Sequence, residues 1–542
     1  MKANKNNRIF VKQWLELKPY DNQVITDIYY IKIANEIRNT ISNRESIVLS
    51  KYLNEEEVNI LACFLASYFE DIISETNIWN TFTNYHYKLY NKKLPFFNIS
   101  EYYENEINEP DVSFLIWYFL NTIQEDKFIS PFNDFIQNTA SKVMSILEKE
   151  YEYAPENLHL KSFYELVVNE SDYYKVRNLI NTILFKTYLF FPDTYQKLKH
   201  QEKELTDKKD LNLLMYLREN RDNFIHKTHT RLLALKGNEW AAELLWEKHP
   251  ITSDLLNISQ RIKGYFFYKG QDDSVIRIEH IASGKSFELT KKSFDHYSSL
   301  KEIDTIIYLG IVQWQNEWWF SGISAQMPFN PDFVIDEKNS LESRMETNFL
   351  DHKEKETEDM LKAQMDSFLK LNNGSQIAFM KSENLNDFVK QTVEHFNESL
   401  NLTEKEKQDA KKRARKDGFF GAENKEEIAG TNEFESCLYF FNPKTGGEIA
   451  LGINSAFPLE NNPFYNTEES ENDVLHLFMA ENLSAELAMF CINKCKDKVP
   501  FLKEGIGKQY MEDIDFLLRF WKKEFYHSRP SITFYGQIKA SR

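Results

Sequence analysis

The stretch that decides the fold is residues 264–323, GYFFYKGQDDSVIRIEHIASGKSFELTKKSFDHYSSLKEIDTIIYLGIVQWQNEWWFSGI. Apolar and polar residues alternate in it, as in 275–280, and Ser283-Gly284 marks a tight turn. Residues 305–314 and 318–323 then predict a hairpin. Five short strands within about sixty residues are enough to close a small barrel, and closure removes exposed sheet edges. The sequence therefore predicts a five-stranded SH3-like or OB-like β-barrel over residues 262–325.

The sequence before this stretch has helical periodicity, and residues 1–255 predict an irregular all-α domain. At Leu53-Asn54-Glu55-Glu56-Glu57, Asn54 can cap a helix while Glu57 reaches back to close a capping box. The helix that follows, 58–73, is apolar on more than one face, which is typical of the centre of a bundle. Residues 111–123 are apolar almost all round but too short to cross a membrane, so we expect a second buried helix. Further helices are expected at 132–151, 162–169, 172–189 and 211–217.

Residues 326–542 predict an α+β C-terminal domain. A highly charged helical stretch near 338–371 is expected to serve as a linker. Strands at 437–441 and 448–453 flank the turn residues Asn442-Pro443-Lys444-Thr445-Gly446-Gly447 and predict a hairpin. Helices are expected at 471–479, 484–496 and 509–525.

Composition limits the protein class. The chain has 542 residues, 42% hydrophobic and 15% aromatic, so it can bury a large core without disulfides or metals. Its net charge of −17 disfavours sequence-blind binding to phosphate backbones. Four cysteines do not make a disulfide scaffold, and neither an apolar secretory region nor a membrane-length apolar run is present. We therefore expect a cytoplasmic protein with no membrane association.

Several segments resemble an uncharacterised family of bacterial cytoplasmic proteins, a domain of unknown function. They are Ile9-Phe10-Val11-Lys12-Gln13-Trp14-Leu15 with Pro19-Tyr20, Leu61-Ala62-Cys63-Phe64-Leu65, Asn77-Ile78-Trp79-Asn80 and Asp111-Val112-Ser113-Phe114-Leu115-Ile116-Trp117-Tyr118. The β stretch is similar to a small module of other bacterial proteins of unknown role, through 279–285 and 318–322. The two resemblances cover about residues 8–325 and imply no catalytic residues.

Two sequence patterns raise the question of a metal site. His226 and His229 lie three residues apart and could share a metal with Glu219 or Asp222, or could simply be surface residues. Cys491 and Cys495 lie four apart on an expected helix, but a second pair for a zinc site is missing, which favours structural thiols. No Walker, dinucleotide, nucleophile-elbow or EF-hand motif is present. We expect neither a metal nor any other cofactor.

A basic cluster at 405–416 is the candidate nucleic-acid-binding element. It contains Lys405, Lys411, Lys412, Arg413, Arg415 and Lys416, which could follow phosphates along one side of a helix. The alternative is a solvated helix that offsets nearby acidic residues. In the barrel, Trp318 and Trp319 could stack on unpaired bases or could fill the barrel and its interface.

These observations lead to two functional hypotheses. The first is a non-catalytic intracellular interaction protein, in which the barrel joins two folded bodies that contact a protein or ribonucleoprotein partner, with an RNA- or ribosome-associated role as a special case. The alternative is a metal-assisted hydrolase with a site assembled from sequence-distant residues.

Overall fold

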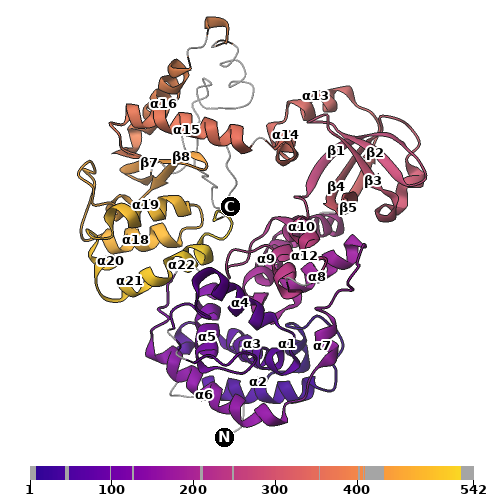
Figure 1. Cartoon of the computed structure of the whole chain (residues 1–542), viewed down its shortest axis with the longest axis vertical. Coiled ribbons are helices and arrows are strands. Elements are labelled where there is room, and N and C mark those ends of the chain that lie inside the picture. The colour runs from indigo at the N-terminus through magenta and orange to yellow at the C-terminus, as the bar shows by residue number, and fades with distance from the viewer. Residues whose placement is uncertain are drawn as a thin grey trace.

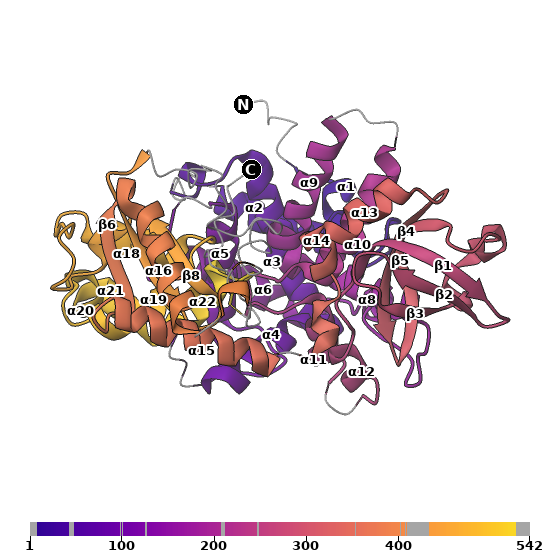
Figure 2. The same cartoon turned by 90° about the horizontal axis from the view of Figure 1, so that it is seen from above.

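The computed structural model describes residues 8–42, 48–97, 99, 101–124, 127–207, 212–246, 249–352, 354–400, 403–406, 408 and 433–526. Over these ranges the chain has a helical N-terminal region, a closed five-stranded barrel and a mixed α/β C-terminal region (Figure 1). The predicted fold class is thus confirmed. Figure 2, seen from above, places the barrel and the C-terminal region on opposite sides of the helical region.

The helical region contains twelve α-helices among the described residues. They are α1 (Val11–Leu15), α2 (Asp27–Ile41), α3 (Glu55–Ser74), α4 (Ile78–Tyr90), α5 (Glu109–Ile123), α6 (Asp134–Glu150), α7 (Leu158–Ser162), α8 (Tyr173–Lys186), α9 (Gln196–Asp207), α10 (Leu213–Lys227), α11 (Gly237–Leu244) and α12 (Thr252–Leu256). The helix expected at 162–169 is wrong, because α7 ends at Ser162 and turns follow it.

Helix α3 begins at the predicted capping box. The Asn54 side chain accepts the backbone N–H groups of Glu56 and Glu57 at 2.9 and 3.0 Å, and the Glu57 carboxylate accepts the Asn54 N–H at 2.7 Å. The helix then buries most of its length, as its apolar composition predicts.

The C-terminal helix α22 (Ile514–Trp521) packs inside the helical region. Phe520 lies 5.2 Å from the Trp117 ring of α5, and Phe516 lies 6.0 Å from Phe114. The Tyr90 hydroxyl also donates to Asp515 at 2.5 Å. One continuous hydrophobic core therefore runs from the first helix to α22. The expectation that the barrel joins the two bodies is incomplete, since α22 joins them directly.

The barrel consists of β1 (Ile262–Gln271), β2 (Val275–His280), β3 (Ser286–Thr290), β4 (Ile306–Trp314) and β5 (Glu317–Met327), in the order β1-β2-β3-β5-β4. All neighbours are antiparallel except β3 and β5, which are parallel and share the single residue pair Leu289 with Trp318. The tight β4–β5 turn places Gln315 and Asn316 at φ values of 46° and 66°, the left-handed conformation that two-residue hairpin turns require.

A buried arginine fixes the barrel to α10. Arg261 has a fully buried side chain and donates to both carboxylate oxygens of Glu219 at 2.7 Å, and its Nη2 also donates to the Ser321 carbonyl at 3.0 Å. A Cβ on Gly310 or Gly322 would lie 2.3 or 2.4 Å from this Nη2. These two strand glycines therefore make the space that the guanidinium occupies.

Beyond the barrel, α13 (Pro331–Asn339), α14 (Leu341–Met345) and α15 (Glu354–Leu371) lead to a three-stranded sheet. Its strands β6 (Ile377–Lys381), β7 (Ser436–Asn442) and β8 (Gly446–Leu451) lie in the order β6-β7-β8. The helices of this region are α16 (Leu385–Ser399), α18 (Ser470–Met479), α19 (Ala485–Cys495), α20 (Pro500–Lys503) and α21 (Gly505–Tyr510). The charged helix α15 packs on the sheet through Phe368, whose ring lies 5.3 Å from Tyr439. The β7–β8 hairpin is confirmed, whereas β6 was not predicted.

Candidate functional site

A cleft of about 670 Å³ opens where the helical region meets the C-terminal region. Its walls come from the start of α3, the end of α5, the turn before α9 with α9 itself, and the segments that carry Arg231, Glu481 and Lys523. Residues that are far apart in sequence thus line one cavity. We refer to this cavity as the cleft. Clefts at such junctions are common ligand sites.

The cleft has an apolar floor and an acidic rim. The floor is lined by Ile60, Phe119, Ile123, Phe191 and Pro192. The side chains of Glu56, Glu204 and Glu481 are exposed around it, and Glu57 is half-buried. The lining also contains the basic residues Lys197, His200, Arg231 and Lys523, of which Lys523 is buried against Asp193. A ligand that brings both apolar surface and positive charge would match this arrangement.

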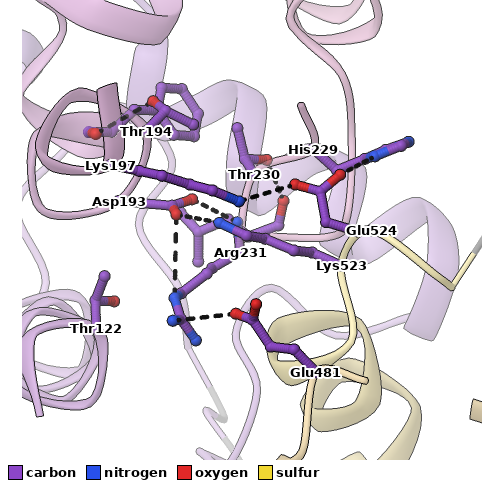
Figure 3. A network of polar contacts seen from close by, with 12 residues as sticks. Thr122, Asp193, Thr194, Lys197, His229, Thr230, Arg231, Glu481, Lys523 and Glu524 are labelled. Atoms are coloured by element: carbon purple, nitrogen blue, oxygen red, sulfur yellow. Dashed lines mark hydrogen bonds and ion pairs between the residues drawn. The ribbon is translucent and has the colours of Figure 1, made fainter. Parts of the chain in front are cut away.

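Asp193, Arg231 and Lys523, which line the cleft, belong to an ion network (Figure 3). Asp193 forms an ion pair with Lys523, and both side chains are 2% exposed. Asp193 also accepts the Arg231 backbone N–H at 2.6 Å. The Arg231 guanidinium reaches outward to Glu481, 3.4 Å away. Four chain segments are therefore held together by opposite charges.

Glu524 extends this network on its other side (Figure 3). It bonds His229 at 3.1 Å and Lys197 at 3.3 Å. Burial alone would raise the pKa of Glu524, but the His229 hydrogen bond and the Lys197 and Lys523 charges lower this pKa to about 2. Burial also lowers the pKa of Lys523, against the opposing effect of Asp193.

The backbone around the network is irregular, which explains how it places these charges. Asp193 lies in a π-helical turn, Phe191–Tyr195, of a kind that often marks functional sites. After Arg231, Leu233 and Ala234 are buried with φ values of 62° and 54°, a conformation that is costly for side chains other than glycine. The Arg519 side chain donates to the Leu233 carbonyl at 3.3 Å, so the end of α22 supports this loop.

The buried carboxylate of the network is already fully engaged within the protein. The buried Asp193 carboxylate is occupied by Lys523 and the Arg231 N–H, so it is not placed to remove a proton from a ligand. Of the exposed rim carboxylates, Glu481 lies 3.4 Å from Arg231 and Glu204 lies 3.3 Å from His200, while Glu56 is exposed at the start of α3. Of the residues in the network and on the rim, sequence reasoning singled out only His229, and for a metal site; it missed the others. The available signal was the Lys522-Lys523-Glu524 run directly after the apolar end of α22, since charges at that point need partners.

The two histidines considered for a metal site have separate partners. His226 is bonded to the Tyr173 hydroxyl at 2.7 Å, and burial lowers its pKa to about 3. His229 instead faces Glu524. Across the described part of the chain, no three His, Cys, Asp or Glu side chains are grouped so that they could hold a metal ion. Cys491 and Cys495 are buried free thiols.

The residues predicted to bind nucleic acid are placed in different ways. Lys405 is exposed, while Lys411, Lys412, Arg413, Arg415 and Lys416 lie outside the described residues. Trp319 is buried against Tyr174, with ring centroids 5.8 Å apart, so it is part of the barrel–helix interface. Trp318 is half-buried, packs 4.9 Å from Phe287 and lines a second cavity of about 650 Å³ at the barrel seam.

Comparison with known protein families identifies a relationship. The family described as "Protein of unknown function (DUF3843)" matches residues 8–309, that is, the helical region and the barrel as far as β4. No curated protein and no solved structure matches the chain. Among the described residues no helix has the length and apolar character needed to cross a membrane.

Proposed function

The chain belongs to the DUF3843 family, and we propose that it is a cytoplasmic, non-catalytic interaction protein that holds a basic segment of a macromolecular partner in the cleft. The observation that carries the proposal is the acidic rim above an apolar floor. Basic side chains of a partner would meet Glu56, Glu204 and Glu481, while an apolar side chain would enter the floor.

The charge of the whole molecule supports a basic partner. A net charge of −17 attracts positively charged macromolecules over long distances and speeds their encounter. The ion network supports the same role, because it fixes the walls of the cleft in advance. A pre-formed site loses less conformational entropy when it binds. Basic protein segments are abundant in ribonucleoproteins, so a protein of a ribonucleoprotein particle is a partner of fitting chemistry.

Site-specific crosslinking tests the proposal. A photoreactive benzoylphenylalanine is placed at Gln201, on the α9 wall of the cleft, and in a second variant at Glu358, an exposed residue of α15 that does not line it. We expect one dominant partner adduct at Gln201, formed through a segment of net positive charge, and no such adduct at Glu358. An acidic crosslinked segment, or equal adducts at both positions, would refute the proposal.

The purified partner then allows a matched measurement of affinity. Replacing Glu56 and Glu204 together by Gln removes two rim charges and should weaken binding roughly tenfold at low salt, with a smaller loss at high salt. Glu358→Gln should leave the affinity unchanged. Binding that is insensitive to the rim substitutions would show that the partner docks elsewhere.

RNA association is a second proposal within the same class. It rests on the basic cluster at 405–416, of which Lys405 is exposed. RNA binding measured across salt concentrations, before and after charge reversal of Lys411, Lys412, Arg413 and Arg415, tests it. Binding that is absent at low salt, or unaffected by the reversal, would remove it. Metal-assisted hydrolysis has less support, because His226 and His229 bond to different partners.

A further inference from the structure

The last described residues of the chain lie close to the cleft. Lys523 lines the cleft, and Tyr526, the last residue of the described ranges, follows it by three positions. The two Cα atoms are therefore no more than ~11 Å apart. Tyr526 is held in place, because its backbone N–H donates to the Lys522 carbonyl at 2.9 Å and the Arg519 guanidinium lies 4.3 Å from its ring. The sequence after Tyr526 thus starts from a fixed point near the cleft.

Residues 527–542, HSRPSITFYGQIKASR, differ in charge from the rest of the chain. They contain Arg529, Lys539 and Arg542 and no Asp or Glu, whereas the whole chain has a net charge of −17. Their large apolar side chains are Ile532, Phe534, Tyr535 and Ile538. These residues lie outside the described ranges, and we call them the 527–542 segment. The segment combines positive charge with apolar side chains.

The lining of the cleft is complementary to this combination. Five carboxylates line it, against three lysine or arginine side chains. Each of the three cations has an acidic partner, in the pairs Lys523–Asp193, Arg231–Glu481 and Lys197–Glu524. The charge that remains is negative, and the floor beneath the rim is apolar. A basic segment with apolar side chains therefore matches both parts of the lining.

We propose that the 527–542 segment docks in the cleft of its own chain, with its basic side chains at the rim carboxylates and an apolar side chain on the floor. Its sixteen residues can span up to ~50 Å, so its length is sufficient. Because it is tethered beside the cleft, its effective concentration there is on the order of 1 mM. An intrinsic Kd of ~0.1 mM would then fill about nine-tenths of the clefts.

Docking of the segment would regulate the cleft. A ligand from outside has to displace the segment, so its apparent affinity falls about tenfold at that occupancy. This consequence rests on the proposed function, because it requires a basic partner that uses the same cleft. The docking itself requires no partner and can be measured in the purified chain.

Crosslinking within the purified full-length chain tests the docking. Benzoylphenylalanine at Gln201, which lines the cleft, should form an adduct with the 527–542 segment. The same group at Tyr153, an exposed residue of the helical region that does not line the cleft, should form no such adduct. A mixture of isotope-labelled and unlabelled chains should give adducts within one chain only.

Charge exchange then tests whether the rim carboxylates hold the segment. The triple variant Arg529→Glu, Lys539→Glu and Arg542→Glu should lower the adduct yield at Gln201 about fivefold or more. Adding Glu56→Lys and Glu204→Lys to this variant should restore most of the yield, because the attraction is reversed at both ends. The matched control reverses three exposed lysines of α15, Lys355, Lys362 and Lys370, and should leave the yield unchanged.

Several results would overturn the inference. They are the absence of a 527–542 adduct at Gln201, equal yields at Gln201 and Tyr153, a yield that does not respond to the charge exchange, and an adduct that joins two chains, since the occupant would then be a second copy. Partner adducts at Gln201 are a separate readout. A partner adduct without docking of the segment would remove this inference alone, whereas docking without a partner adduct would remove the proposed function alone.

Discussion

Replacing Arg261 by Met should loosen the barrel from the helical region. The Arg261 side chain is fully buried, and its guanidinium makes two 2.7 Å bonds to Glu219 and further bonds to the hydroxyl and carbonyl of Ser321. Loss of one partner of a buried ion pair costs ~3–5 kcal/mol, because the other charge is left without compensation. Glu219 keeps 16% of its side-chain surface, so water can reach it after the substitution. We therefore expect the lower end of that range, ~3 kcal/mol.

Two further variants separate charge from geometry. Arg261→Lys keeps the charge but cannot form the paired bonds to Glu219, so it should lose ~2 kcal/mol. Lys269→Met removes a lysine of the barrel that is paired with Asp304 at a partly exposed position, and should lose less than ~1 kcal/mol.

The assay combines urea unfolding with hydrogen exchange. The unfolding free energy should fall in the order Lys269→Met, Arg261→Lys, Arg261→Met, and exchange in β4 and β5 should rise in the same order. A loss below ~1 kcal/mol for Arg261→Met would refute the reasoning, because the pair would then behave like an exposed one. A loss confined to the C-terminal region would refute it as well, because it would show that Arg261 does not hold the barrel.

Three more predictions follow from buried contacts. Lys523→Met should destabilise the chain by ~3 kcal/mol, because Asp193 would keep only its Arg231 contacts. Protease cleavage after α22 should also become faster. The control is Lys444→Met, which removes a partly exposed pair with Glu486 and should change the cleavage rate less. Burial lowers the pKa of His226 from 6.5 to about 3, so the unfolded chain takes up a proton first as the pH falls. Stability should therefore drop by roughly 1 kcal/mol per pH unit below about 6, and His226→Gln, measured by thermal unfolding from pH 7 to 4, should make this slope shallower. Gly237→Ala would place a Cβ 2.6 Å from the Ile180 side chain and 2.7 Å from that of Leu184, so it should lower the free energy of unfolding in urea by ~1–3 kcal/mol. The double variant with Leu184→Ala should lose less stability than the sum of the two single variants, because the smaller side chain relieves the clash.

The barrel and the central helices could be predicted because their signals are local. Alternation at 275–280 and the turn residues Gln315 and Asn316 act over a few residues, and the Asn54 capping box acts within one helical turn. Strand β6 was missed because Ile377–Lys381 is short and is made a strand by pairing with β7, which lies 59 residues later between Ile377 and Ser436. The helix predicted at 162–169 does not form, because α7 ends at Ser162 and turns follow it.

The cleft could not be predicted because no local pattern encodes it. Asp193, Arg231, Glu481 and Lys523 meet through the insertion of α22, which is a property of tertiary packing. Single acidic and basic residues are too frequent in this chain for any such pair to stand out. Trp318 and Trp319 are neighbours that the barrel turns to opposite sides, one to the seam and one to the helical interface.

The position of α22 also bears on how the chain matures during synthesis. Trp117 and Phe114 of α5 are covered by Phe516 and Phe520 of α22. The ribosome adds these two residues about 400 residues later. At 5–20 residues per second this delay is roughly 20–80 s, during which the nascent polypeptide would present a wide aromatic surface. A fragment that ends where the family match ends, at residue 309, would lack Phe516 and Phe520 and would leave this aromatic surface uncovered.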